Sequence, residues 1–279
     1  MNLSPHFSSR RNLLALLALS TLAGISAFTI HTPAKEPGRT ATQKLAKVFQ
    51  FSTLPALSLG LYDGEMTFRE LLKHGNFGVG TFDALDGELI ILNGKAWRVR
   101  ADGRVSAVDA KTTTPFAAVT HFTPDRSLKI TQPTEYSALQ RRLSEMLPTP
   151  NLPYPIEIRG TFARLKVRSV PKQKKPYRAL AEVVKTQSVW EWQNVKGTLV
   201  GFRFPAYLSG VNLADYHFHF LSDDKQRGGH VLDCTLEKGD LKLQALRDFE
   251  MVLPRGRDFD RANLEVGQGE ALDQTEKIQ

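Results

Sequence analysis

Tyr216-His217-Phe218-His219-Phe220 leads through the polar segment 222–227 into Gly228-Gly229-His230-Val231-Leu232-Asp233, and this stretch decides the fold around it. Aromatic residues and histidines alternate at 216–220, a pattern that predicts a β-strand with His217 and His219 on one face. The polar segment and the two glycines predict a turn, after which a second strand begins. The stretch therefore predicts a β-hairpin.

Three histidines of this hairpin predict a metal site. In a symmetric hairpin His219 lies opposite His230, and opposed residues have Cβ atoms about 4.5–5.5 Å apart. Both imidazoles can then reach one ion, with His217 as the third ligand, and three protein ligands leave a coordination position open, as in catalytic zinc sites. A bulge at Gly228-Gly229 would shift this register.

The histidines and Cys234 allow two other interpretations. Single histidines on a half-buried sheet usually bind nothing, but three of the chain's seven fall within residues 217–230 at compatible spacing, which favours metal binding. Cys234 has the same strand parity as His230 and is a weak candidate for a fourth ligand. A lone cysteine in a strand is more often a small buried hydrophobe, so the predicted ligand set is limited to the histidines.

The N-terminal segment has the layout of a secretory signal peptide. Residues 1–34 contain no acidic residue, carry Arg10-Arg11 and continue into a leucine-rich run. The run is too short for a convincing membrane span, and the paired arginines also resemble a twin-arginine signal. We therefore predict an exported protein, periplasmic or secreted, with a linker at residues 35–43 and no stable membrane anchor after signal removal.

Composition limits the classes of function. The 279 residues carry a net charge of +8, but the basic residues concentrate at 164–168 and 172–175 without interleaved aromatic residues, which argues against nucleic-acid binding. A single cysteine excludes an intrachain disulfide. The chain therefore resembles an ordinary globular enzyme that acts on a small molecule.

Strand and turn signals dominate the rest of the chain. We predict strands at 79–85, 88–92 and 96–100 separated by Asp86-Gly87 and Asn93-Gly94 turns, a helix at 134–146 and a strand at 156–170. The predicted fold class is sheet-rich α/β with two subdomains, each a mixed or antiparallel sheet with flanking helices. The basic stretch at 171–176 suggests an N-terminal sheet subdomain at 44–175 and a C-terminal metal-binding subdomain at 176–279.

Three separated blocks of the chain resemble the acetolactate decarboxylase family. They are residues 78–89, 160–168 and 216–233, and the resemblance runs from about Phe49 to the C-terminus. It implies decarboxylation of 2-acetolactate to acetoin and carbon dioxide, a step of acetoin and butanediol biosynthesis, by a homodimer. It also implies that His217, His219 and His230 hold Zn²⁺.

The resemblance assigns roles to four further residues. Loss of carbon dioxide leaves an enediolate, which needs a Lewis acid and a positioned proton donor. Glu88 matches the family's proton-donating glutamate, and Arg168 matches a substrate-binding arginine whose guanidinium suits bidentate contact. Thr81 matches a polar residue of the pocket, and Glu276 matches a second catalytic glutamate close to the metal.

The residues alone leave other functions open. Glu88 after Asp86-Gly87 is also an ordinary hairpin-end carboxylate, and Arg168 is also compatible with a solvated basic face. Three histidines on antiparallel strands serve zinc hydratases and cupin-like oxygenases too, although their third ligand usually comes from a more distant strand. An exported metal-binding protein without catalytic activity is the remaining alternative.

Overall fold

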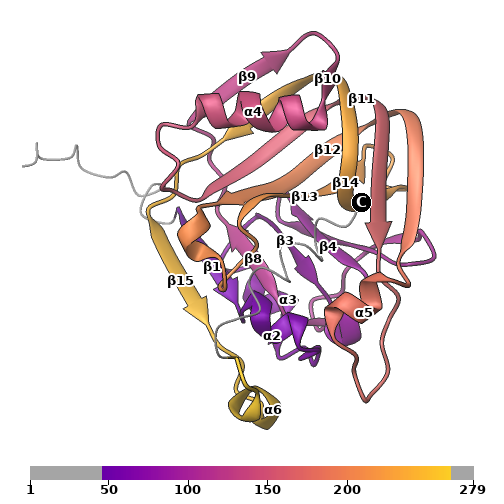
Figure 1. Ribbon diagram of the computed structural model, residues 1–279, viewed down its shortest axis with the longest axis vertical. Coiled ribbons are helices and arrows are strands. Elements are labelled where there is room, and N and C mark those ends of the chain that lie inside the picture. The colour runs from indigo at the N-terminus through magenta and orange to yellow at the C-terminus, as the bar shows by residue number, and fades with distance from the viewer. Residues whose placement is uncertain (1–45, 265–279) are drawn as a thin grey trace, which may run out of the picture. The chain divides into compact units, whose positions relative to one another are not determined.

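The computed structural model describes residues 46–264. Strands dominate and short helices flank them (Figure 1). This agrees with the predicted sheet-rich α/β class. The signal peptide and linker predicted at 1–43, and Glu276, lie outside the described residues. Within residues 46–264, no helix is both long and apolar enough to span a bilayer.

A seven-stranded mixed sheet forms one layer of the fold. Its strand order is β15-β1-β8-β3-β4-β5-β6, in which β1 and β15 are parallel and the other pairs are antiparallel. The strands span Lys47–Phe51 (β1), Phe77–Thr81 (β3), Glu88–Leu92 (β4), Lys95–Val99 (β5), Val105–Ala107 (β6), Ala117–Thr120 (β8) and Asp248–Val252 (β15). A separate two-stranded pair joins β2 (Met66–Thr67) to β7 (Thr113–Thr114).

A six-stranded antiparallel sheet forms the second layer. The order β10-β14-β11-β12-β13 is extended by β9, which pairs with β14. The strands span Arg126–Ile130 (β9), Thr134–Glu135 (β10), Tyr154–Ser169 (β11), Ser188–Phe204 (β12), Asp215–Ser222 (β13) and Gly228–Leu243 (β14). The helix α4 (Tyr136–Met146) lies over one face of this sheet (Figure 1), and it buries Leu139 and Leu143 in the core there.

The remaining helices are short. They are α2 (Leu54–Ser58), α3 (Phe68–Leu71), α5 (Leu180–Val184) and α6 (Arg257–Arg261), with 3-10 turns η1 (Asp83–Leu85) and η2 (Ala206–Leu208). At α3 the Thr67 hydroxyl accepts a hydrogen bond from the amide of Glu70 at 3.3 Å, which satisfies a donor that the first helical turn leaves unpaired.

The two sheets pack against each other through one apolar cluster. Val79 and Ile90 of the seven-stranded sheet meet Val200, Phe202 and Leu221 of the six-stranded sheet in this core. The other face of the six-stranded sheet buries a second cluster that includes Phe218 and Phe220. Both faces of β13 are therefore covered, and β13 directs the buried His219 and Leu221 toward the first sheet.

The predicted hairpin is confirmed in its register. Residues 219–221 of β13 pair with 228–230 of β14, and His219 lies opposite His230. The glycine pair does not shift this pairing. Gly229 stays in the ladder opposite Phe220, with a φ of 146°. The predicted strand at 79–85 ends earlier, at Thr81, because Ala84 and Leu85 adopt φ values of 56° and 57°, which an extended strand cannot accommodate.

The strand pairing does not divide at the boundary predicted at residue 175. β11 and β12 lie on either side of that boundary and pair in register from Tyr154–Arg203 to Ser169–Ser188 within one sheet. β15, near the C-terminal end, pairs with β1 in the other sheet. Basic and proline residues mark a loop between neighbouring strands here, and each sheet draws on distant parts of the chain.

The parity assumed for Cys234 is wrong. Val167 of β11 pairs with Val231, whereas the preceding Lys166 pairs with Asp233, so Leu232 is an extra residue that reverses the alternation of β14. Cys234 consequently packs in the apolar cluster with Val231 and is fully buried. It faces away from the histidines.

The buried position of Cys234 predicts an effect on stability alone. Cys234→Ser places a hydroxyl in an apolar core, and we expect a loss of about 1–3 kcal/mol in the free energy of unfolding, with the metal content unchanged. Cys234→Ala, which adds no polar atom, is the control and should lose less. Urea denaturation and metal analysis check this, and loss of metal from both variants would contradict the bulge.

Candidate active site

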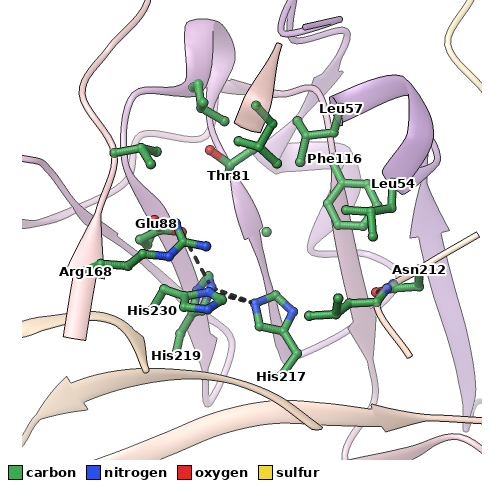
Figure 2. A pocket seen from close by; sticks show the side chains of 15 residues that line it. Leu54, Leu57, Thr81, Glu88, Phe116, Arg168, Asn212, His217, His219 and His230 are labelled. Carbon is green, nitrogen blue, oxygen red and sulfur yellow. Dashed lines mark hydrogen bonds and ion pairs between the residues drawn. The ribbon is translucent and has the colours of Figure 1, made fainter. Parts of the chain in front are cut away.

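The three histidines converge on one point. Nε2 of His217 lies 3.1 Å from Nε2 of His219 and 3.1 Å from Nδ1 of His230, and one ligand atom of each residue lies within 4.8 Å of the others. Figure 2 shows the rings turned toward one another on β13 and β14. The alternation on β13 directs Phe218 and Phe220 to the opposite face, as the sequence predicted.

The nitrogen spacing fits a metal centre. Bonds of about 2.0–2.1 Å at tetrahedral angles place two ligand nitrogens about 3.3–3.4 Å apart, close to the 3.1 Å separations of the ring nitrogens. The same separations also allow direct hydrogen bonds between the rings, whose direction depends on the tautomers of His217 and His230. The group can hold one metal ion.

A hydrogen bond from the other sheet sets the tautomer of His219. Its Nδ1 lies 2.8 Å from the carbonyl oxygen of Leu89, and because a carbonyl only accepts, Nδ1 carries the hydrogen. The lone pair of His219 is then on Nε2, which faces the other two rings. Metal-binding histidines commonly donate their second nitrogen to a carbonyl in this way.

Electrostatics keeps two of the imidazoles neutral. Burial, followed by the positive charge of Arg168, lowers the pKa of His217 to about 3. Burial is also the main cause that lowers the pKa of His219 well below its ordinary value, with His217 and Arg168 adding to the effect and the hydrogen bond to Leu89 opposing it. Neutral imidazole is the form that binds a metal ion.

Glu88 and Arg168 lie beside the histidines, although 80 residues separate them in the chain. Glu88 begins β4, and Arg168 lies opposite His230 in the β11–β14 ladder. An Nη1 of Arg168 is 3.5 Å from Oε1 of Glu88, and Oε2 of Glu88 is 3.6 Å from Nε2 of His219. Arg168 is only 3% exposed and Glu88 only 6%, so Arg168 does not belong to a solvated basic face.

The neighbouring arginine of β11 serves as a contrast. Arg164 makes an ion pair with Asp233 at 2.5 Å, and its side chain is 34% exposed. It therefore fits the surface role that the basic alternation of β11 suggests, whereas Arg168 does not. Because bulges interrupt the pairing of β11 with β14, strand parity alone did not separate the two arginines.

Thr81 lines the same pocket. The pocket has a cavity volume of about 40 Å³ and also contains the three histidines, Glu88 and Arg168. The Thr81 hydroxyl donates to the carbonyl of Gly87 at 2.8 Å. The structure thus brings together every predicted site residue within the described range, and Glu276 lies outside that range.

The sequence did not predict the apolar wall of the pocket. Figure 2 shows Leu54, Leu57 and Phe116 on the side of the pocket away from Glu88. Asn212 and Leu213 approach from the loop before β13 and complete the lining. These residues come from three separate segments and carry no local motif, so only the tertiary structure groups them.

The fold and the site define a class: a sheet-rich α/β protein with a three-histidine group, able to hold a metal ion, beside a buried arginine and glutamate. Residues 48–266 match the model of the alpha-acetolactate decarboxylase family. The chain is 45% identical to the alpha-acetolactate decarboxylase of Methanosarcina mazei over 82% of this chain and 80% of that protein. It is 40% identical to that of Bacillus subtilis over 80% and 88%, respectively.

Solved structures agree with the sequence comparison. The crystal structure of the Bacillus subtilis strain 168 alpha-acetolactate decarboxylase superposes with a TM-score of 0.81 at 38% identity, covering 83% of this chain and 99% of that one. A Staphylococcus aureus protein described as similar to alpha-acetolactate decarboxylase has a TM-score of 0.78 at 29% identity. The chain therefore belongs to the alpha-acetolactate decarboxylase family, and it is a carbon–carbon lyase of the carboxy-lyase class.

The three-histidine group predicts which variants lose metal. His219→Ala removes a ligand and leaves the Leu89 carbonyl without its donor, so we expect metal content to fall from about one ion per chain to a small fraction of that. His121→Ala is the control, because His121 lies outside the group and contacts the carbonyl of Lys73. Elemental analysis after dialysis measures both, and full metal retention by His219→Ala would contradict the assignment.

Proposed function

We propose that this protein decarboxylates 2-acetolactate to acetoin and carbon dioxide with Zn²⁺ held by His217, His219 and His230. The observation that supports this most directly is the placement of Glu88 and Arg168. Both are buried, and Glu88 lies 3.6 Å from a ring nitrogen of the three-histidine group. A protein that only stored a metal ion would have no need of a buried acid and a buried cation beside a pocket.

The donor set suits the proposed ion. Three neutral imidazoles are ligands that zinc accepts, and they leave positions open for substrate oxygens. A bound zinc ion would supply a Lewis acid for the ketone and hydroxyl oxygens of acetolactate. Imidazoles also accept copper, iron and nickel, so the choice of zinc is part of the proposal and is tested below.

The protein's own side chains would do the rest of the chemistry. In the reaction the bond between C2 and the carboxylate breaks, carbon dioxide leaves, and the electron pair moves onto the ketone oxygen to give an enediolate. A proton is then added to C2, and acetoin is released. We assign Glu88 as the proton donor, because a buried carboxyl group beside the histidines can reach one face of a bound substrate.

Arg168 would bind and orient substrate oxygens. Its guanidinium is planar and suits two parallel hydrogen bonds to a carboxylate or to neighbouring oxygens. In the structure its partner in the pocket is Glu88, at 3.5 Å. When substrate binds, its oxygens and Glu88 would both contact the Arg168 guanidinium. The guanidinium would then fix the position of the substrate relative to Glu88.

The pocket walls complete the proposed site. The apolar side formed by Leu54, Leu57 and Phe116 would face the methyl groups of acetolactate and exclude water from the enediolate. Thr81 would contribute a hydroxyl oxygen on the opposite side, and Glu276 remains a proposed catalytic residue close to the metal. Export through the N-terminal signal and a homodimeric assembly also remain proposals.

The direct test is acetoin formation from racemic 2-acetolactate by purified protein starting at Lys35. We expect activity that falls to background after chelation and returns when zinc is added, because the Lewis acid would be required in every turnover. Copper, iron and nickel are added in parallel arms. Bound metal without acetoin would overturn the proposal in favour of a hydratase, an oxygenase or a binding protein, and restoration by another metal alone would overturn zinc.

Glu88→Gln tests the proton donor. The amide keeps the size of the side chain but cannot donate a carboxylic proton, so we expect kcat to fall about 10²- to 10⁴-fold with zinc content unchanged. Glu70→Gln is the matched control, since Glu70 pairs with Lys73 on the solvent side of α3. Unchanged turnover in Glu88→Gln would remove Glu88 from the mechanism.

A further inference from the structure

The turn that leads into β4 holds two groups of the site in place. Glu88 is the first residue of β4, and the carbonyl of the next residue, Leu89, accepts the hydrogen bond from His219 at 2.8 Å. Any displacement of this turn would therefore move a proposed proton donor and a support of a proposed metal ligand together. The forces that hold the turn are thus relevant to catalysis.

The turn adopts a backbone conformation that needs support. Ala84 and Leu85 have φ values of 56° and 57°, and Gly87 has a φ of 98°. Two consecutive non-glycine residues in the left-handed region are strained and persist only where surrounding contacts enforce them. A side chain at Gly87 would overlap the carbonyl oxygen of Val99, so the turn lies directly against the end of β5.

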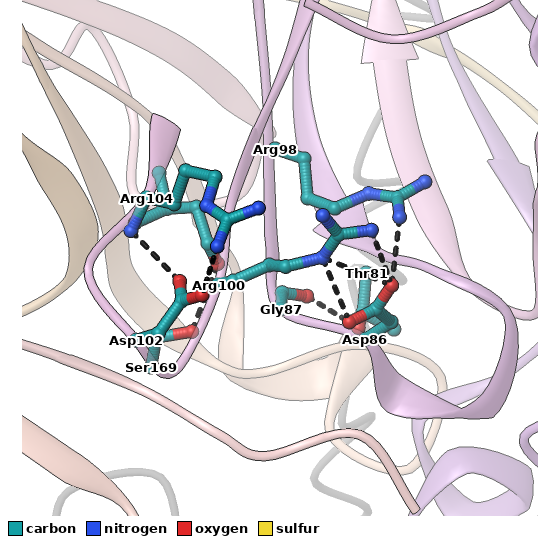
Figure 3. A network of polar contacts seen from close by, with 9 residues as sticks. Thr81, Asp86, Gly87, Arg98, Arg100, Asp102, Arg104 and Ser169 are labelled. Carbon is teal, nitrogen blue, oxygen red and sulfur yellow. Dashed lines mark hydrogen bonds and ion pairs between the residues drawn. The ribbon is translucent and has the colours of Figure 1, made fainter. Parts of the chain in front are cut away.

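Asp86 supplies the strongest contacts between this turn and β5. It accepts a hydrogen bond from Nη1 of Arg98 at 2.7 Å, and from Nε and Nη2 of Arg100 at 3.2 Å and 3.0 Å. Figure 3 shows the Asp86 carboxylate between the two guanidinium groups. Asp86 is 8% exposed, so these charge-assisted hydrogen bonds are poorly screened by water and strong.

The two arginines flank the partner of Glu88. In the β4–β5 ladder Glu88 pairs with Val99, which stands between Arg98 and Arg100. The Val99 carbonyl accepts a hydrogen bond at 2.9 Å from the hydroxyl of Ser169, the residue after Arg168. Arg98 also lies over the ring of Phe82, 4.2 Å from its centroid. The network in Figure 3 thus links the backbone on both sides of the Glu88–Arg168 pair.

We propose that Asp86 is a positioning residue of the active site: through Arg98 and Arg100 it fixes the turn that sets Glu88 and the Leu89 carbonyl against the three histidines. It does not touch the substrate pocket, whose lining includes Glu88 and not Asp86. The part of this inference that concerns Glu88 rests on the proposed function. The part that concerns His219 does not, because the hydrogen bond to Leu89 exists whatever the reaction is.

Asp86→Asn tests the proposal, with Asp102→Asn as the matched control. The amide cannot hold two guanidinium groups, and we expect kcat per bound zinc to fall about 10- to 100-fold, as for a misplaced catalytic group, with a smaller change in KM. Asp102 pairs with Arg104 at 3.2 Å in the next turn, where both side chains are more than half exposed. Asp102→Asn should leave kcat unchanged.

A second measurement does not depend on activity. In the cobalt-substituted protein, the visible absorption bands report the geometry of the histidine ligands, and we expect Asp86→Asn to shift them and to weaken cobalt binding about 10-fold. Asp102→Asn should give the wild-type spectrum. A lower melting temperature with an unchanged spectrum and unchanged kcat would mean that Asp86 only stabilises the fold, and would overturn the proposal.

Two further variants separate the possible failures. Arg100→Gln removes part of the network at a half-exposed side chain and should still fold, with an effect on kcat in the same direction but smaller. In kcat per bound zinc, Asp86→Asn combined with Glu88→Gln should lose less than the product of the two single losses, because part of the effect of Asp86→Asn acts through Glu88. If Glu88→Gln alone keeps full turnover, the proposed role of Glu88 fails, and the cobalt spectrum still decides whether Asp86 positions His219.

Discussion

The pairing of His219 with His230 is the constraint on which the site depends. Side chains of a strand alternate between faces, so a slip of one residue in the β13–β14 pairing would direct His217 and His219 into the core that holds Phe218 and Phe220. The aromatic residues on one face oppose that slip, because it would bring them to the polar pocket. Burial of one face of β13 thus fixes the position of the histidines on the other.

The hairpin was predictable because its information is local. Alternation of two residue types fixed the faces, and a polar run ending in glycines fixed the turn, so the ligand triangle followed without any knowledge of distant segments. Glu88 and Arg168 were identified differently, by the resemblance of short blocks to a known family. Strand parity alone placed Arg168 with Arg164 and Lys166, and only the tertiary structure shows that Arg168 is buried while Arg164 is not.

The errors of prediction have physical causes that lie outside a local window. Leu232 is an extra residue in β14, so the side chains after it point to the opposite faces from those expected. The sequence around Cys234 contains no signal for this bulge. The subdomain boundary suggested at residue 175 followed composition and stays a prediction; β11 and β12 pair across that position. The left-handed residues Ala84 and Leu85 resemble a strand in sequence. The backbone hydrogen bonds that Ala84 makes with Tyr62 and Gln173 come from segments that are distant in the chain, so a local window does not contain them.

Arg168 links the electrostatics of the histidines to that of the proposed substrate site. A buried guanidinium is costly unless it is paired, and here the neighbouring carboxylate is Glu88 at 3.5 Å. Burial, and after it the same positive charge, lowers the pKa of His217, which disfavours a protonated ring. Protonation of the ring is therefore disfavoured in this cavity, and the neutral ring keeps its lone pair for a metal ion. If Arg168 orients an anionic substrate, as proposed, its positive charge has two effects. It helps to keep His217 neutral for metal binding, and it attracts the substrate.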